Sequence, residues 1–170
     1  MRTRFAPRIF CTLFVLLTSV AGSHAKDYVV ALGKGSVVIP FSKSWDVSKI
    51  DRGIEAKTGD DEIYIWAEAY REDRVDTIMD EHGRYFAEQG VTIVGKIKSE
   101  TRVVNGLQMK MLDVPARWKG DRTVVQYLLV DPGWPSGWKL MLTEWASPKG
   151  DRMYQKDMDA ILNGLSFEGR

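Results

Sequence analysis

Residues 62–90 read EIYIWAEAYREDRVDTIMDEHGRYFAEQG, and the spacing of the apolar residues changes within this stretch. From Glu62 to Ala69 the residues alternate, with large apolar or aromatic side chains in both alternating sets. This pattern is typical of a strand inside a sheet rather than at its edge. From Val75 to Phe86 the apolar residues recur at intervals of three and four, as in a helix that buries one face. We therefore predict a domain that mixes strands and helices.

The helix is expected to span Asp73 to Glu88. Asp73 is a suitable N-cap, and Gly90 stands where a left-handed residue commonly follows a helix. The side chains expected to face the sheet are Ile78, Met79, Tyr85 and Phe86. His82 lies on the same stripe and is the only histidine beyond residue 25. We interpret it as a packed histidine with one satisfied nitrogen, because histidine catalysis needs partners that the sequence does not identify.

Short β-rich runs lie on both sides of this stretch. The expected strands are residues 28–31, 36–39, 54–57, 91–101 (with an interruption at Gly95), 107–118, 123–130 and 138–145. Residues 40–45 are expected to leave the sheet. Short turns such as Asn105-Gly106 join the later strands, and short connections permit only antiparallel pairing. Residues 147–165 are typical of a second amphipathic helix, begun by Ser147-Pro148, after which Phe167 packs back on the sheet. The predicted fold class is α+β, a single antiparallel sheet of about six to seven strands flanked by two main helices.

The first 25 residues have the composition of a secretory signal peptide. Arg2, Arg4 and Arg8 precede an apolar run at residues 9–20, and Ser23-His24-Ala25 places small residues at positions −3 and −1 of a cleavage site. The run is shorter than the roughly 20 apolar residues that span a bilayer. We predict residues 1–25 as a cleavable signal peptide, residues 26–170 as a single globular domain, and a periplasmic or secreted location. Gly22 is an alternative start of the mature chain.

Cleavage would remove Cys11, the only cysteine of the chain, so the remaining domain forms no disulfide and depends on packing. All six tryptophans lie beyond residue 25 and offer large apolar surfaces for a core. With three arginines removed and no acid, the formal charge changes from +1 to −2. No basic stripe is visible, so nucleic acid is not an expected partner.

The sequence carries no nucleophile-elbow, phosphate-loop or dinucleotide motif. Asp60, Asp61 and Glu62 stand together in a turn, but their spacing fits no EF-hand, and we interpret them as solvated. Glu68 and Glu144 would form an acid–base pair if their strands were neighbours. Carboxylates on strands are more often cross-strand partners of basic residues. We predict no metal, no cofactor and no catalytic residue.

The segment DPGWPSGW, residues 131–138, places two tryptophans in a connection that proline and glycine keep irregular. A rigid aromatic side chain on a loop supplies contact area at little entropic cost. We therefore take Trp134 and Trp138 as candidate partner-binding residues. In the alternative interpretation, Trp138 begins its strand facing the core and Trp134 covers the rim of the sheet.

The stretch VVIPFSKSW, residues 37–45, resembles the opening of the PsbP/DcrB-like superfamily, a short strand followed by a proline, a small residue and a tryptophan. The alternating strand ending near Ala69, one helix of about fifteen residues, a meander with an Asn-Gly turn and a final helix running into Leu165-Ser166-Phe167 also match. The superfamily includes the PsbP extrinsic subunit of photosystem II, exported DcrB-like proteins and a nuclear Ran-binding release factor. The resemblance implies an α-β-α sandwich and a non-enzymatic role in docking to other proteins, but it carries over no binding residue.

Together these features predict an exported, non-enzymatic binding or accessory protein of the bacterial cell envelope. Its expected partner is another envelope protein, and no transmembrane segment is expected in residues 26–170. An envelope hydrolase that uses carboxylates and a small-molecule carrier remain as alternatives. A carrier requires an apolar cavity between the sheet and a helix, whereas a hydrolase requires a pocket with converging acids.

Overall fold

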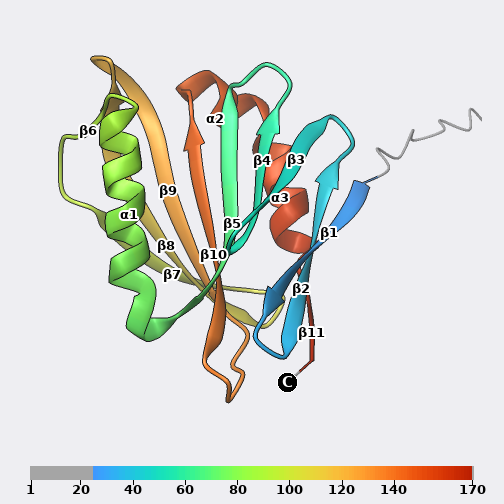
Figure 1. The fold of residues 1–170 in the computed structure, drawn as a ribbon. Coiled ribbons are helices and arrows are strands. Elements are labelled where there is room, and N and C mark those ends of the chain that lie inside the picture. Colours follow the sequence, from blue (N-terminus) through green and yellow to red (C-terminus); the bar gives the residue numbers. More distant parts are fainter. Residues whose placement is uncertain (1–24, 170) are drawn as a thin grey trace, which may run out of the picture.

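The computed structural model describes residues 25–169, which form a large and a small antiparallel sheet with three α-helices (Figure 1). The predicted signal peptide lies outside the described residues apart from Ala25, so its cleavage stays a prediction. Within residues 25–169 no helix is long and apolar enough to cross a membrane.

The large sheet has eight strands. They are β3 (Trp45–Ile50), β4 (Gly53–Thr58), β5 (Ile63–Arg71), β6 (Val91–Ile93), β7 (Lys98–Val104), β8 (Leu107–Trp118), β9 (Asp121–Asp131) and β10 (Trp138–Ala146). Their order is β3-β4-β5-β10-β9-β8-β6, and β7 also pairs with β8. The pairing of β7, β8, β9 and β10 is antiparallel throughout, which confirms the predicted meander.

The small sheet consists of β1 (Ala25–Leu32), β2 (Gly35–Ser42) and β11 (Ser166–Glu168), in the order β1-β2-β11. The α+β class is therefore confirmed, but the prediction of a single sheet of about six to seven strands is wrong. The prediction that residues 40–45 leave the sheet is also wrong for most of that stretch. Pro40, Phe41 and Ser42 belong to β2 and Trp45 begins β3 of the large sheet, so only the turn at residues 43–44 lies outside the strands. The alternation within a strand shows which of its faces is buried, but it does not show which sheet the strand joins.

The helices cover opposite faces of the large sheet, as Figure 1 shows for α1 on one side and α3 with the small sheet on the other. The helices are α1 (Val75–Glu88), α2 (Pro148–Met153) and α3 (Gln155–Asn163), and a 3₁₀ turn, Glu72–Arg74, precedes α1. The second predicted helix is thus two helices, divided at Tyr154, whose backbone (φ −101°, ψ 10°) is not helical. Ser147 caps α2 as predicted, by accepting a hydrogen bond from the Gly150 N–H.

Alternate residues of β5 enter two separate cores. Ile63, Ile65 and Ala67 of β5 belong to the core shared with α3 and the small sheet, and we call this side of the large sheet the α3 face. Trp66 and Tyr70 belong to the core beneath α1, and we call that side the α1 face. The two-sided burial explains why both alternating sets of residues 62–69 contain large apolar side chains.

The packing of α1 follows the predicted stripe with two differences. Ile78 and Phe86 are buried and Met79 is half-buried, but Tyr85 is 41% exposed and makes an edge contact with Trp66 of the sheet. The helix begins after Arg74 and has no side-chain cap, so Asp73 is not the N-cap. Gly90 has the positive φ of 83° expected of a residue that ends a helix.

Candidate functional site

A pocket of about 320 Å³ lies on the α3 face, between strands β8, β9 and β10 and the helices α2 and α3. Its floor and walls are mostly apolar, formed by Ile65, Met109, Met111, Leu128, Leu142, Met158 and Leu162. Its charged and polar lining comes from Arg102, Gln126, Asp151, Arg152, Gln155 and Asp159. An open groove of about 470 Å³ adjoins it along β8 and β9 and shares Gln126 and Asp151. The fold thus contains a concave, mainly apolar site between the sheet and a helix pair.

Glu144 on β10 also lines this pocket and is only 7% exposed. Its register places it between Ile65 of β5 and Gln126 of β9. The Oε1 atom is buried and has no hydrogen-bond partner among residues 25–169. Burial raises the pKa of this carboxyl to about 7, and the negative charges of Asp151 and Asp113 add to the effect.

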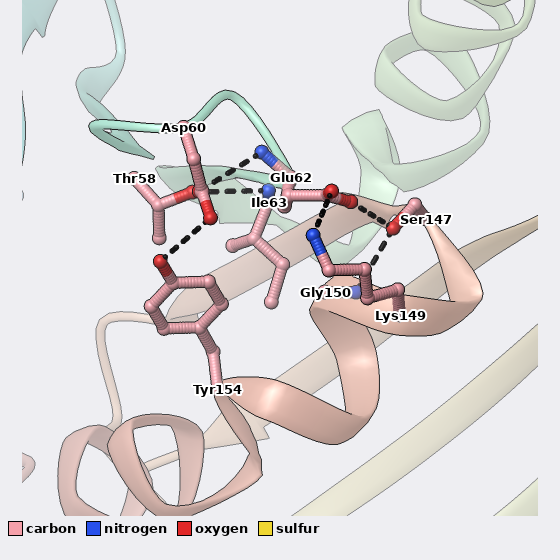
Figure 2. A network of polar contacts seen from close by, with 8 residues as sticks. All are labelled: Thr58, Asp60, Glu62, Ile63, Ser147, Lys149, Gly150 and Tyr154. Atoms are coloured by element: carbon pink, nitrogen blue, oxygen red, sulfur yellow. Dashed lines mark hydrogen bonds and ion pairs between the residues drawn. The ribbon is translucent and has the colours of Figure 1, made fainter.

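The helical wall of the pocket is tied to the turn between β4 and β5 by the polar network in Figure 2. Glu62 accepts hydrogen bonds from the Ser147 hydroxyl and, at 2.9 Å, from Lys149 Nζ. Tyr154, between α2 and α3, donates its hydroxyl to Asp60 Oδ2 at 3.0 Å. A Cβ placed at Gly150 would lie 2.4 Å from the backbone oxygen of Glu62, so α2 approaches the sheet as closely as glycine permits. These contacts fix α2, and with it one side of the pocket.

The same network accounts for the acids that stand together in the sequence. Asp60 and Glu62 hold α2, while Asp61 accepts hydrogen bonds from Lys57 at 2.8 Å and from Tyr64 at 3.0 Å. Each of the three carboxylates thus has protein partners of its own. Among residues 25–169, no group of three or more metal-ligating side chains gathers around a common point.

The proposed acid–base pair of Glu68 and Glu144 is not formed. Their strands β5 and β10 are neighbours, but Glu68 is registered opposite Met141, three residues from Glu144. Because side chains alternate between the two sides of a sheet, this odd offset places Glu68 on the α1 face and Glu144 on the α3 face. The sheet itself separates the two carboxyl groups.

Glu68 instead is the buried member of a charge cluster beneath α1. Its Oε2 lies 2.7 Å from His82 Nε2, and its Oε1 lies 3.0 Å from Arg52, which also pairs with Glu81 at 2.8 Å. Burial alone would raise the pKa of Glu68, but the hydrogen bonds and charges of His82 and Arg52 outweigh it and lower the pKa below its ordinary value. The His82 ring stacks on Tyr127 with centroids 5.8 Å apart, and Nδ1 lies 3.4 Å from Thr143 Oγ1. His82 is therefore a packed histidine, with polar neighbours at both nitrogens.

Trp134 and Trp138 both pack on the small sheet and are half-buried. Trp134 makes an edge contact with Phe167 of β11, with ring centroids 6.0 Å apart, and a Cβ placed at Gly35 would lie 2.5 Å from its ring. Trp138 is the first residue of β10, and its indole edge lies against Gly33 in the β1–β2 turn. The loop thus joins the large sheet to the small one, and partner binding by these two residues stays a prediction.

Replacement of Trp134 by alanine separates the two roles. Since the indole is half-buried, we expect Trp134→Ala to lower the free energy of unfolding by about 2 kcal/mol, roughly half the cost of deleting a fully buried tryptophan. Chemical denaturation of Trp134→Ala measures this cost. Trp138→Ala, at the point where the loop enters β10, is the comparison. A loss within about 0.5 kcal/mol would show that the contact with Phe167 does not hold the loop and would favour the partner-binding role.

The Glu144 pocket was not predicted, although the sequence contains a signal for it. Leu140, Leu142, Glu144 and Ala146 alternate along one strand, so Glu144 is a carboxyl in an otherwise apolar row. Such a residue is either paired across the sheet or buried without a partner. The register and the position of α2, which the sequence does not show, decide between these outcomes.

A scan against protein-family models finds no match, and a search of curated proteins finds none either. Solved structures do match. The chain is similar to the cyanobacterial PsbP protein CyanoP of Synechocystis sp. PCC 6803, with a TM-score of 0.59 and 6% identity over 87% of this chain and 95% of that one. It is also similar to LpqN of Mycobacterium tuberculosis, with a TM-score of 0.57 and 13% identity over 86% of this chain and 92% of that one. At such low identity the likeness concerns the fold alone, and this chain has the PsbP-like fold that the sequence resemblance implied.

Proposed function

We propose that this chain is an exported, non-catalytic binding protein of the bacterial cell envelope that holds a small amphipathic ligand in the Glu144 pocket. The predicted signal peptide supports the location. LpqN, which shares the fold, is described as involved in cell envelope biogenesis. Among the alternatives considered from the sequence, a small-molecule carrier best fits the pocket between the sheet and the helices. In the cell envelope, such a carrier acts as an accessory to another protein.

The observation that carries the proposal is the unpaired carboxyl group inside an apolar pocket. A buried polar atom without a hydrogen bond costs about 1–3 kcal/mol, and Glu144 Oε1 is such an atom. A ligand that donates a hydrogen bond to this oxygen would remove the cost, while its apolar part would cover Met111, Leu128 and Leu142. The pocket therefore fits an apolar molecule with one amine or other donor group.

The geometry supports binding over the carboxylate hydrolysis considered as an alternative. That mechanism needs an acid and a base on the two sides of one substrate bond. Glu68, the partner proposed for Glu144, lies on the opposite face of the sheet. The pocket also has Asp151, which is half-buried, and Asp159, which is exposed, but Glu144 is its one deeply buried carboxyl and the lining is mostly apolar, which is the composition of a ligand pocket.

Calorimetric titration with three probes of equal chain length tests the proposal. At pH 8, where most Glu144 side chains are ionised, n-octylamine should bind at least about tenfold more tightly than octanoate, with n-octanol between them. The reason is that a hydrogen bond to a charged group contributes about 1.5–3 kcal/mol. Glu144→Gln should remove most of the preference for the amine.

Glu88→Gln is the matched control, since Glu88 is exposed at the end of α1 on the opposite face. It should leave all three affinities unchanged. Nuclear magnetic resonance shifts caused by octylamine should concentrate on Leu128, Leu142 and Met158. If none of the probes binds, or if Glu144→Gln leaves the amine preference intact, the proposal is wrong.

A further inference from the structure

A second pocket, of about 520 Å³, lies at the end of β5, next to the turn that connects β3 to β4. Its lining comes from β1, the β3–β4 turn, the last residues of β5, the start of α1 and Trp138. The β4–β5 ladder ends with Gly53 opposite Glu68, so the edge of β5 from Ala69 to Arg71 has no β4 residue beside it. The pocket is thus separate from the Glu144 pocket, which lies between β8–β10 and the helices α2 and α3.

The charged lining of this pocket is strongly positive. It contains Lys49, Arg52, Arg71 and Arg74, against the single acid Asp51. Arg52 is held by Glu68 and Glu81, and Arg71 lies 3.5 Å from Asp73. Lys49 and Arg74 form no ion pair with any residue from 25 to 169. Among residues 25–169, two cations without an ion pair and one weakly paired arginine therefore surround a space in which an anion would neutralise their charge.

The remaining lining is apolar or aromatic. Val29 is 61% exposed, an unusual exposure for a valine, and Ile50, Ile78 and the Trp138 ring continue the apolar surface. Tyr70 also lines the pocket and is only 2% exposed. Burial raises the pKa of this phenol to about 12, so Tyr70 stays a neutral donor at physiological pH.

From this combination we propose that the pocket binds a phosphate group attached to an apolar body. The planar guanidinium groups of Arg71 and Arg74 match the oxygens of a phosphate, and Lys49 adds a mobile charge. Val29, Ile50 and Trp138 would receive the apolar part next to the charged group. The same chemistry is found in the headgroup of an anionic phospholipid and, without the apolar body, in free phosphate.

Titration with soluble short-chain probes tests the site and separates these sources. Dihexanoyl phosphatidic acid should bind, with an affinity that falls as salt is added, because the contacts are charged and open to solvent. The double variant Lys49→Gln/Arg74→Gln should weaken this binding at least about tenfold. Arg84→Gln, which removes an exposed arginine of α1 outside the pocket, should leave it unchanged.

Inorganic phosphate and dihexanoyl phosphatidylcholine complete the experiment. Binding of phosphatidic acid without measurable binding of inorganic phosphate identifies a lipid-like ligand, and comparable binding of both identifies a free-anion site. Equal affinities for phosphatidic acid and phosphatidylcholine would overturn the proposal, because the second headgroup has no net charge. The proposal is also wrong if neither phosphatidic acid nor phosphate binds, or if the double variant binds as well as the unmodified protein. Glu144→Gln should leave the binding of phosphatidic acid to this pocket unchanged. A failure of the phosphate proposal can therefore be distinguished from a failure of the proposal for the Glu144 pocket.

Discussion

Phe86→Ala should lower the free energy of unfolding by about 3–5 kcal/mol, the usual cost of deleting a buried phenylalanine side chain. Phe86 is 6% exposed and belongs to the core between α1 and the large sheet. Its ring meets Trp66 and Trp145 edge to face, with centroids 6.0 and 5.8 Å away. Truncation would leave a cavity between these large rings, which cannot collapse without moving the helix.

Glu88→Ala on the same helix is the matched control for Phe86→Ala. Glu88 is exposed and takes part in no ion pair among residues 25–169, so its loss should change the free energy of unfolding by no more than about 0.5 kcal/mol. Denaturant melts followed by tryptophan fluorescence measure both. Equal effects of the two substitutions would show that the buried face of α1 is assigned incorrectly.

Glu144→Gln should stabilise the protein at pH 8 by about 3 kcal/mol and change its stability little at pH 4. The pKa of Glu144 is raised from 4.5 to about 7 in the folded protein. At pH values between 4.5 and about 7 the folded state binds more protons than the unfolded state, so the free energy of unfolding falls as the pH rises. Above pH 7 the whole difference, about 3 kcal/mol, is lost. A glutamine has no charge to bury and escapes this cost.

Glu68→Gln is the natural comparison, since Glu68 is equally buried but paired. Its pKa is lowered in the folded state, so its contribution to stability is present above the unfolded-state value and is lost as the pH falls through the folded-state value. Glu68→Gln should therefore destabilise at pH 8, opposite in sign to Glu144→Gln. Urea melts of both variants at pH 4 and pH 8 measure the two trends. A Glu144→Gln effect that does not depend on pH would contradict the burial of an ionisable carboxyl.

The local structure of this protein is largely predictable from its sequence, because it depends on spacing. The alternation from Glu62 to Ala69 and the stripe from Val75 to Phe86 each identify an element, and Ser147 followed by Pro148 identifies a helix start. Tyr85 shows the limit of this reasoning. It lies at the border of the stripe, and whether a border residue is covered depends on how far the sheet extends beneath the helix, which is a property of the whole fold.

The candidate site was harder to predict, because it depends on register and on which elements pack together. The sequence shows Glu68 and Glu144 as similar acids on two strands. Their pairing offset by an odd number of residues sends them to opposite faces, where one meets His82 and Arg52 and the other meets no partner. The tryptophans of residues 131–138 were visible in the sequence, but their contacts with the β1–β2 turn, β2 and β11 come from residues far away along the chain.

The pairing of β2 with β11 has a consequence for how the protein reaches its folded state. Val38 is hydrogen-bonded into one small sheet with Ser166, so nearly the whole described chain must be available before this sheet can close. The meander from β7 to β10 consists of local hairpins and is expected to assemble early, whereas closure of so long a loop is entropically costly and comes late. A chain threaded through a membrane from its amino-terminal end would therefore stay without its complete small sheet until its last strand emerged.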